Sequence, residues 1–305
     1  MAAGPLRTTG WSSVRRIAQR SVRCHDDRVA GTGSVGTVAS LFDSVAPSYE
    51  SAGVPWFVPI AERLVDEIDP HTGSRVLDAG CGRGCALPAL SAAVGATGRV
   101  VGIDISPGML RRARETVQRR DLRHVDLHLM DATAPALPPM SFSIVVSSLV
   151  LFFLPDPAAA LRAWHGLLVP SGRIGVTTFA ERDDTWRALD ALFDPYLPPG
   201  LLDARTSGSR GPFASDAGMI DLMVAAGFER VRTVRWEQPV DLRDVEHWRT
   251  WTMSLGQRAM WEAVPALDVD ALLERAVDIV GDGPFTLRQT VRLTAAERPS
   301  VMRTH

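Results

Sequence analysis

Short apolar strands alternate with amphipathic helices from about residue 74, and this rhythm constrains the fold more than any other feature of the chain. Residues 75–78 form an apolar strand that ends in an acid, and residues 86–94 have the pattern of a helix. Ser106-Pro107 then favours a helix start, since Ser caps the first turn and Pro fits it. Further strands are expected at 99–104, 125–130, 142–147 and 173–178. Strands separated by single helices predict right-handed βαβ units and a parallel sheet.

After residue 178 the alternation breaks, and the rest of the chain suggests additions to this core. Residues 180–214 are rich in Pro, Gly and Ser, and residues 243–283 look helical and carry several Trp. A helix at 215–226 and strands at 230–238 and 285–295 complete the pattern. We therefore expect one domain over 37–305, with insertions near 180–214 and 243–283 that form a cap over the carboxyl edge of the sheet.

The first 36 residues differ from the rest in composition. They are rich in Arg, Ser and Thr and contain no acid before Asp26. A transit peptide has this composition, and so does a disordered bacterial N-terminus, which we favour. All basic residues of the chain are Arg, as a GC-rich genome would produce.

Composition also limits the partners and the compartment. The 305 residues carry a formal net charge of −2, and no long basic stripe follows the N-terminal segment, which argues against nucleic acid as the main partner. Three cysteines without paired spacing fit a reducing cytoplasm. The longest apolar run, 144–154, is too short for a membrane span.

A glycine-rich turn follows the first strand. Its spacing is Gly80-x-Gly82-x-Gly84, and such a turn allows backbone to approach a ligand closely. The dinucleotide fingerprint requires Gly or Ala one position after Gly84, where this chain has Cys85. On the glycines alone, a tight structural turn and a ligand site are equally good interpretations.

Three acids at successive strand ends favour the ligand site. Asp78 ends the first strand, Asp104 the second and Asp131 the third. Ligands of open α/β sheets bind outside the carboxyl ends of the strands. There, Asp104 is placed to accept from ribose hydroxyls, Asp131 from an adenine amino group and Asp78 from an ammonium. The three charges would repel a pyrophosphate, so we expect an adenosyl ligand without phosphate.

These residues also resemble a known family. The string 76–84 resembles motif I of the class I S-adenosylmethionine (SAM)-dependent methyltransferases, and 102–110 resembles their second-strand motif. Asp131-Ala132 falls at the family's adenine site, and 168–173 resembles its turn before strand five. Residues 42–50 are similar to a segment that helps cover the cofactor in the ubiquinone and menaquinone C-methyltransferase branch.

The resemblance implies a fold, a cofactor and a set of contacts. The fold would be α/β, a Rossmann-like seven-stranded sheet of order 3-2-1-4-5-7-6 with the last strand antiparallel and a helical cap. The cofactor would be SAM, with S-adenosylhomocysteine (SAH) as product. The residues expected to contact it are Tyr49, Asp78, Gly80, Gly82, Asp104, Ile105, Met109, Asp131, Ala132 and Ser147.

Methyl transfer from SAM then requires mainly that the molecule receiving the methyl group is correctly positioned. The segment 147–153 after the fourth strand is apolar and lacks a carboxylate, so we expect no metal and a hydrophobic small molecule methylated at O or C, in bacterial secondary metabolism. His247 is a candidate base, whereas His165 is expected to be structural. A cyclase or pericyclase with bound SAM, and a non-catalytic SAM-binding subunit, remain alternatives, and a homodimer is left open.

Overall fold

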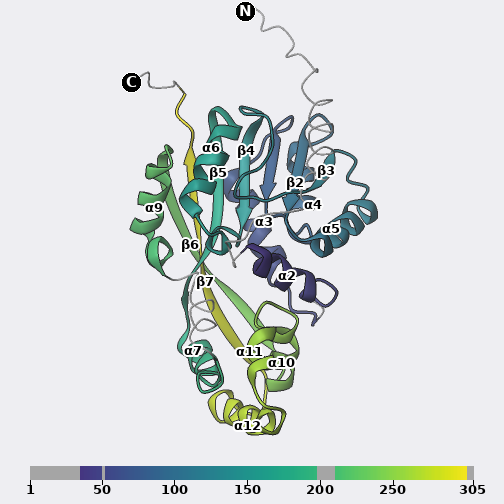
Figure 1. Ribbon diagram of the computed structural model, residues 1–305, viewed down its shortest axis with the longest axis vertical. Coiled ribbons are helices and arrows are strands. Elements are labelled where there is room, and N and C mark those ends of the chain that lie inside the picture. Colours follow the sequence, from purple (N-terminus) through teal and green to yellow (C-terminus); the bar gives the residue numbers. More distant parts are fainter. Residues whose placement is uncertain (1–34, 50–51, 198–209, 301–305) are drawn as a thin grey trace, which may run out of the picture.

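The computed structural model describes residues 35–49, 52–197 and 210–300 (Figure 1). Within them one sheet has the order β3-β2-β1-β4-β5-β7-β6. The first five strands are parallel, and β7 is antiparallel to both β5 and β6. The predicted Rossmann-like order and the antiparallel last strand are confirmed. The strands are β1 (Arg75–Ala79), β2 (Arg99–Asp104), β3 (Val125–Leu129), β4 (Phe142–Ser148), β5 (Leu168–Arg182), β6 (Glu229–Leu242) and β7 (Phe285–Glu297).

Helices cover both faces of the sheet, and this explains why its central strands are apolar at nearly every position. Val76 packs with the helices of one face and its neighbour Leu77 with those of the other. The first face carries α3 (Phe57–Ile68), α4 (Leu87–Val94) and α5 (Pro107–Arg119). The second face carries α6 (Pro157–Leu167) and α9 (Asp216–Ala225).

The helix starts follow the predicted capping chemistry. Ser106 Oγ accepts from the Met109 amide at 3.0 Å, and Pro107 occupies the first turn of α5. Asp156 caps α6 in the same way, with Oδ1 accepting from the Ala159 amide at 2.8 Å. Both caps lie just beyond strands, so they fix where the chain turns back along the sheet.

The strands β5, β6 and β7 are much longer than the others and extend past the rest of the sheet (Figure 1). Their far end carries α7 (Asp184–Ala191), α10 (Val245–Met253), α11 (Arg258–Ala263) and α12 (Val269–Val280). The helix α2 (Val35–Val45) lies between the sheet and these lower helices. Short 3₁₀ turns occur at Leu151–Phe153, Gly211–Ala214 and Ala266–Asp268.

The last three strands are longer than expected. The fifth strand, predicted at 173–178, begins at Leu168, within the expected turn, and continues to Arg182 because Phe179 and Arg182 still pair with β7 across a register shift. The region 180–191, expected to be irregular, is therefore the end of β5 followed by α7. Residues 198–209 of the expected insertion lie outside the described residues. The expected disordered segment 1–36 also lies outside them, except that residues 35 and 36 begin α2.

Candidate active site

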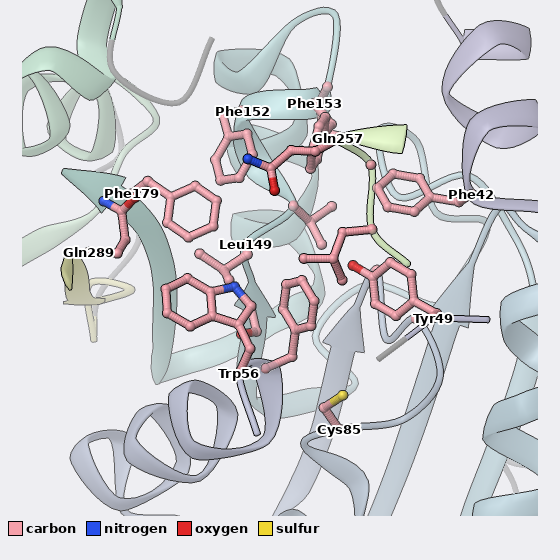
Figure 2. Close-up of a pocket in the computed structure, with 18 of the residues that line it drawn as sticks. Phe42, Tyr49, Trp56, Cys85, Leu149, Phe152, Phe153, Phe179, Gln257 and Gln289 are labelled. Carbon is pink, nitrogen blue, oxygen red and sulfur yellow. The ribbon is translucent and has the colours of Figure 1, made fainter. Parts of the chain in front are cut away.

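A cavity of about 740 Å³ lies at the carboxyl ends of β1 to β5 (Figure 2). Its volume and its mixed lining of apolar side chains and a few polar groups are typical of a small-molecule site. One side is lined by the strand-end acids and the glycine loop. The other side is lined by aromatic rings from several distant segments. We call these the cofactor side and the acceptor side, after the ligands that the sequence leads us to expect there.

The cofactor side brings together nearly all of the residues that the sequence singled out. Those that line it are Tyr49, Asp78, Gly80, Gly82, Asp104, Ile105, Met109, Asp131 and Ala132. Ser147 does not, because its fully buried Oγ donates to the Ala79 carbonyl at 2.8 Å. Its neighbour Ser148 lines the cavity instead, as expected where successive side chains of a strand point to opposite faces.

The glycine loop leaves space where a ligand would approach. Gly80, Gly82 and Gly84 all have positive φ, of 79°, 54° and 89°. A Cβ on Gly80 would come within 2.5 Å of the Val150 side chain, so this position is closed by the protein itself. A Cβ on Gly82 would meet nothing within 4 Å. The backbone at Gly82 is therefore open to the cavity that it lines.

The Asp104 carboxylate connects the loop to the second strand. Its Oδ2 accepts from the Gly82 amide at 2.8 Å, and its Oδ1 accepts from the Ser106 amide at 2.9 Å. Burial raises the pKa of Asp104, an effect that these backbone N–H groups oppose. Each oxygen keeps a second lone pair, so the carboxylate can still accept from ligand hydroxyls.

Asp78 differs from the other two acids because one of its oxygens is buried without a partner. It is 2% exposed, and its Oδ2 makes no hydrogen bond within the described residues. Burial, and then the charge of Asp104, raise the pKa of Asp78 to about 7. A buried acceptor without a donor is costly, and a cationic ligand would satisfy it. Asp131, by contrast, accepts from the Thr133 amide at 2.8 Å.

Two residues next to the cofactor side, Asp43 and Arg83, make hydrogen bonds that the sequence did not predict. Asp43 Oδ1 accepts from the Gly108 amide at 2.8 Å and from Ser106 Oγ, which joins α2 to the start of α5. Arg83 Nη1 donates to the Tyr49 carbonyl at 2.6 Å. The resemblance of segment 42–50 was a signal for this cover, but it did not identify Asp43 as its anchor.

The acceptor side is an aromatic wall that the sequence did not predict as a unit. Phe179 lies 5.4 Å from Phe152 and 6.3 Å from Trp56, measured between ring centroids. Trp56 in turn lies 5.7 Å from Trp186 and 5.9 Å from Trp251. The aromatic residues of this wall are Trp56, Phe57, Phe152, Phe153, Phe179, Trp186, Phe213 and Trp251.

The tryptophans of the 243–283 region divide between wall and core. Trp251 lines the cavity, and its buried Nε1 has no hydrogen-bond partner among the described residues. Trp248 and Trp261 pack on each other, 5.2 Å apart, and both are buried against Phe193. This region therefore contributes both to the core and to the cavity.

The structure does not place the candidate base His247 on the cavity wall. Its Nδ1 accepts from the Arg243 amide at 3.2 Å, so Nε2 carries the proton and donates to the Ala52 carbonyl at 3.0 Å. Nδ1 thus closes the turn that leads into α10, and Nε2 holds α10 against the segment before α3. His165 lies on α6 beside Phe228, 5.0 Å between ring centroids, as expected for a structural residue.

Comparisons with known proteins agree with this geometry. The profile of a methyltransferase domain matches residues 77–176. Aklanonic acid methyltransferase DauC of Streptomyces sp. (strain C5) is 42% identical over 166 residues, which cover 54% of this chain and 76% of that protein. Nocamycin O-methyltransferase of Saccharothrix syringae is 33% identical over 278 residues, which cover 85% of this chain and 98% of that protein.

The chain belongs to the class I SAM-dependent methyltransferase family. Its fold is also that of the [4+2]-cyclase SpnF, with a TM-score of 0.56 and 19% identity over 90% of this chain and 98% of that one. At that identity the likeness concerns the fold alone. As a member of this family, the chain is an enzyme whose cofactor is SAM.

The cofactor side fits this methyltransferase cofactor on three independent features. SAM carries an ammonium, which suits the unpartnered Asp78 Oδ2. Its ribose hydroxyls suit the remaining lone pairs of Asp104, and the open face of Gly82 allows close approach.

Burial, and then the charge of Asp78, raise the pKa of the nearby Cys81 thiol, so Cys81 stays neutral and fills space.

Within the described residues, no group of three or more His, Cys, Asp or Glu side chains is arranged to hold a metal ion. No helix in the described ranges is both long and apolar enough to cross a bilayer.

Proposed function

We propose that this methyltransferase transfers the methyl group of SAM to an oxygen atom of a hydrophobic small molecule in bacterial secondary metabolism. The observation that carries the proposal is the continuity of one cavity from the three acids to the aromatic wall. The two relatives support it, since each is named for a small molecule and one is named an O-methyltransferase. Oxygen is therefore favoured over carbon as the methylated atom.

The contacts expected from the sequence now become specific assignments. We assign Asp104 to the ribose hydroxyls, Asp131 and Ala132 to the adenine, and Asp78 to the ammonium. Gly80 shapes the loop and Gly82 approaches the ligand. Met109 and Ile105 line the cavity beside Asp104, and Tyr49 covers it together with its stacked neighbour Phe57, 5.1 Å away.

The residues of the chain contribute mainly position and exclusion of water. The sulfonium of SAM is already an activated methyl donor, so the protein has only to align an acceptor with it. Proximity and orientation of this kind can lower a barrier by about 7–11 kcal/mol. No histidine is among the described residues that line the cavity, whereas the carboxylates of Glu181, Asp190 and Asp194 do line it. We propose an acceptor oxygen that ionises readily, as an acidic hydroxyl or a carboxyl does, so that it needs no stronger base than a carboxylate.

The lower helices act as a cap in this proposal. Trp186 of α7, Trp251 of α10 and Met260 of α11 all line the acceptor side. They close the cavity away from the sheet and shield the reacting atoms from water. Metal independence, a cytoplasmic location, a possible homodimer and the absence of a nucleic-acid partner remain predictions.

Turnover with a deuterated methyl group tests the proposal. The full chain is incubated with methyl-deuterated SAM and a panel of hydrophobic phenols and carboxylic acids, and products are analysed by mass spectrometry. We expect a labelled ether or ester together with an equal amount of SAH. A rearranged product without SAH would instead indicate a cyclase. Tight SAM binding without turnover of any acceptor would indicate a non-catalytic subunit.

A further inference from the structure

Two glutamines line the cavity and differ in how their amides are used. Gln289 of β7 is 1% exposed, and its Oε1 accepts from Arg182 Nε at 3.1 Å. Its Nε2 donates to the Glu181 carbonyl at 3.0 Å and to the Thr290 carbonyl at 2.9 Å. Donors and acceptor of Gln289 are therefore all occupied, and this side chain serves the structure of the wall.

Gln257 lies in the short loop between α10 and α11, directly before the first turn of α11. Within the described part of the chain its side chain makes no hydrogen bond, and it does not cap α11. It is half-buried and lines the same cavity. Figure 2 shows the amide on the cavity side of the loop, drawn beside the adjoining rings of Phe152 and Phe153. A polar group beside an aromatic wall in this way is available to a ligand.

The loop that carries Gln257 is held in place from both ends. Arg258 Nε donates to the Met253 carbonyl at 3.1 Å, and its Nη2 donates to Ser48 Oγ at 3.1 Å. Upstream, the bond from His247 Nε2 to the Ala52 carbonyl holds α10 against the same N-terminal segment. That segment also carries Tyr49 on the cofactor side. Gln257 is thus fixed at the boundary between the two sides of the cavity.

The rings around this amide restrict the shape of what it can meet. Phe152 lies 4.6 Å from Phe153 and 5.4 Å from Phe179, and Trp56 stacks on Phe179. Aromatic walls favour flat π-systems, which pack on them face-on or edge-on. A branched aliphatic ligand of the same volume would leave gaps against these rings. The wall therefore selects a planar partner, and the amide adds one directional contact.

We propose that Gln257 orients the methyl acceptor by a hydrogen bond to one of its oxygens, and that the acceptor is a flat, multi-ring aromatic molecule carrying a carbonyl or hydroxyl group. That this molecule receives the methyl group rests on the proposed function, whereas its binding next to Gln257 does not. The hydrogen bond fixes the rotation of a disc-shaped ligand within the wall. It thereby determines which oxygen lies nearest to the methyl group.

A binding experiment without turnover tests this. Fluorenone and fluorene share one three-ring skeleton and differ by the carbonyl oxygen. Their affinities for the SAH-loaded full chain are measured by equilibrium dialysis, for the wild type and for Gln257→Leu. We expect Gln257→Leu to reduce the preference for fluorenone roughly three- to tenfold, the effect of one neutral hydrogen bond. Fluorene affinity and SAH affinity should stay unchanged.

The controls separate the possible failures. Gln257→Met repeats the loss with an unbranched side chain, and Gln118→Leu, at an exposed position on α5, should leave the preference unchanged. An unaltered preference in both Gln257 variants would overturn the role of Gln257. Failure of the wild type to bind either compound would overturn the flat aromatic class. Absence of methyl transfer, with the binding pattern intact, would count against the proposed function only.

Discussion

The two sides of the cavity are built in opposite ways. Apart from Tyr49, the cofactor side uses residues that follow three consecutive strands, between Asp78 and Ala132, and it buries an acceptor without a partner, Asp78 Oδ2. The acceptor side gathers rings from positions as distant as Trp56 and Trp251, and it buries a donor without a partner, Trp251 Nε1. The first side is determined by local strand register and suits a cation. The second depends on long-range packing and suits a flat apolar ligand.

Removing Asp104 should have the largest effect, and on one side only. We expect Asp104→Ala to weaken SAH binding by roughly two orders of magnitude, because hydrogen bonds to a charged group contribute about 1.5–3 kcal/mol each. Calorimetry at constant pH measures this. Fluorenone binding to the acceptor side should change much less.

Two further variants make this result interpretable. Asp104→Asn keeps an acceptor oxygen and should retain part of the affinity. Asp66→Ala removes an exposed carboxylate on α3 and should have no effect. If SAH affinity were unchanged in Asp104→Ala, the ribose assignment would be wrong.

Acidic pH should have the next largest effect: it should weaken SAH binding on the cofactor side but leave ligand binding on the acceptor side unchanged. Because the pKa of Asp78 is raised to about 7, its carboxyl is neutral below that pH and ionised above it. An ammonium binds the ionised form, so cofactor binding below pH 7 must release this proton. We expect SAH affinity to fall about tenfold per pH unit below 7 and to be flat above it.

Calorimetry between pH 5.5 and 8, in buffers of different ionisation enthalpy, measures both the affinity and the released proton. Asp78→Asn should bind weakly at every pH without this slope. Fluorenone carries no titrating group, so its affinity should be nearly constant over the range. An SAH affinity that is equally flat in the wild type would exclude Asp78 as the ammonium partner.

A smaller effect is expected from a substitution on the acceptor side, which should weaken binding of the aromatic ligand and leave SAH binding unchanged. Phe179→Leu keeps an apolar side chain but removes a ring that packs on Trp56 and Phe152. Aromatic pairs contribute about 0.5–1.5 kcal/mol beyond their buried area, so fluorenone affinity should fall about two- to tenfold. SAH affinity, measured in parallel, should not move. A matching loss of both would show that the two sides do not act separately.

The sequence predicted which residues gather on the cofactor side because its signals there are local; their contacts with the cofactor stay a prediction. A strand that ends in an acid places that acid at the carboxyl edge of a parallel sheet, whatever the rest of the chain does. Asp78, Asp104 and Asp131 followed from this rule alone. Ser147 failed because the prediction did not resolve which of two adjacent serines faces the cavity.

The acceptor side could not be predicted because no local pattern marks it. Trp251, Trp248 and Trp261 belong to one helical region, yet the first lines the cavity and the others fill the core. Their difference depends on how α10 packs against α11 and the long strands. The length of β5 was missed for the same reason, since its extension pairs with β7, more than a hundred residues away.

The smallest expected effect concerns two of these tryptophans. Trp251 and Trp261 are both buried, but of the two only Trp261 has a hydrogen-bond partner for its indole among the described residues: Nε1 donates to Thr252 Oγ1 at 2.9 Å. Trp→Phe removes a similar apolar area at each site. Trp261→Phe also breaks a hydrogen bond, whereas Trp251→Phe removes a donor that pairs with nothing in the described residues.

Because both variants lose a similar buried apolar area, the difference between their free energies of unfolding reports the hydrogen-bonding of the indole. A net hydrogen bond contributes about 0.5–1.5 kcal/mol, and an unpaired buried donor costs about 1–3 kcal/mol. We therefore expect Trp251→Phe to have a free energy of unfolding at least about 1 kcal/mol above that of Trp261→Phe. Urea unfolding of the cofactor-free protein measures both. Equal losses would mean that the Trp251 indole finds a partner in solution, and the acceptor side would then resemble an ordinary core rather than a surface prepared for a ligand.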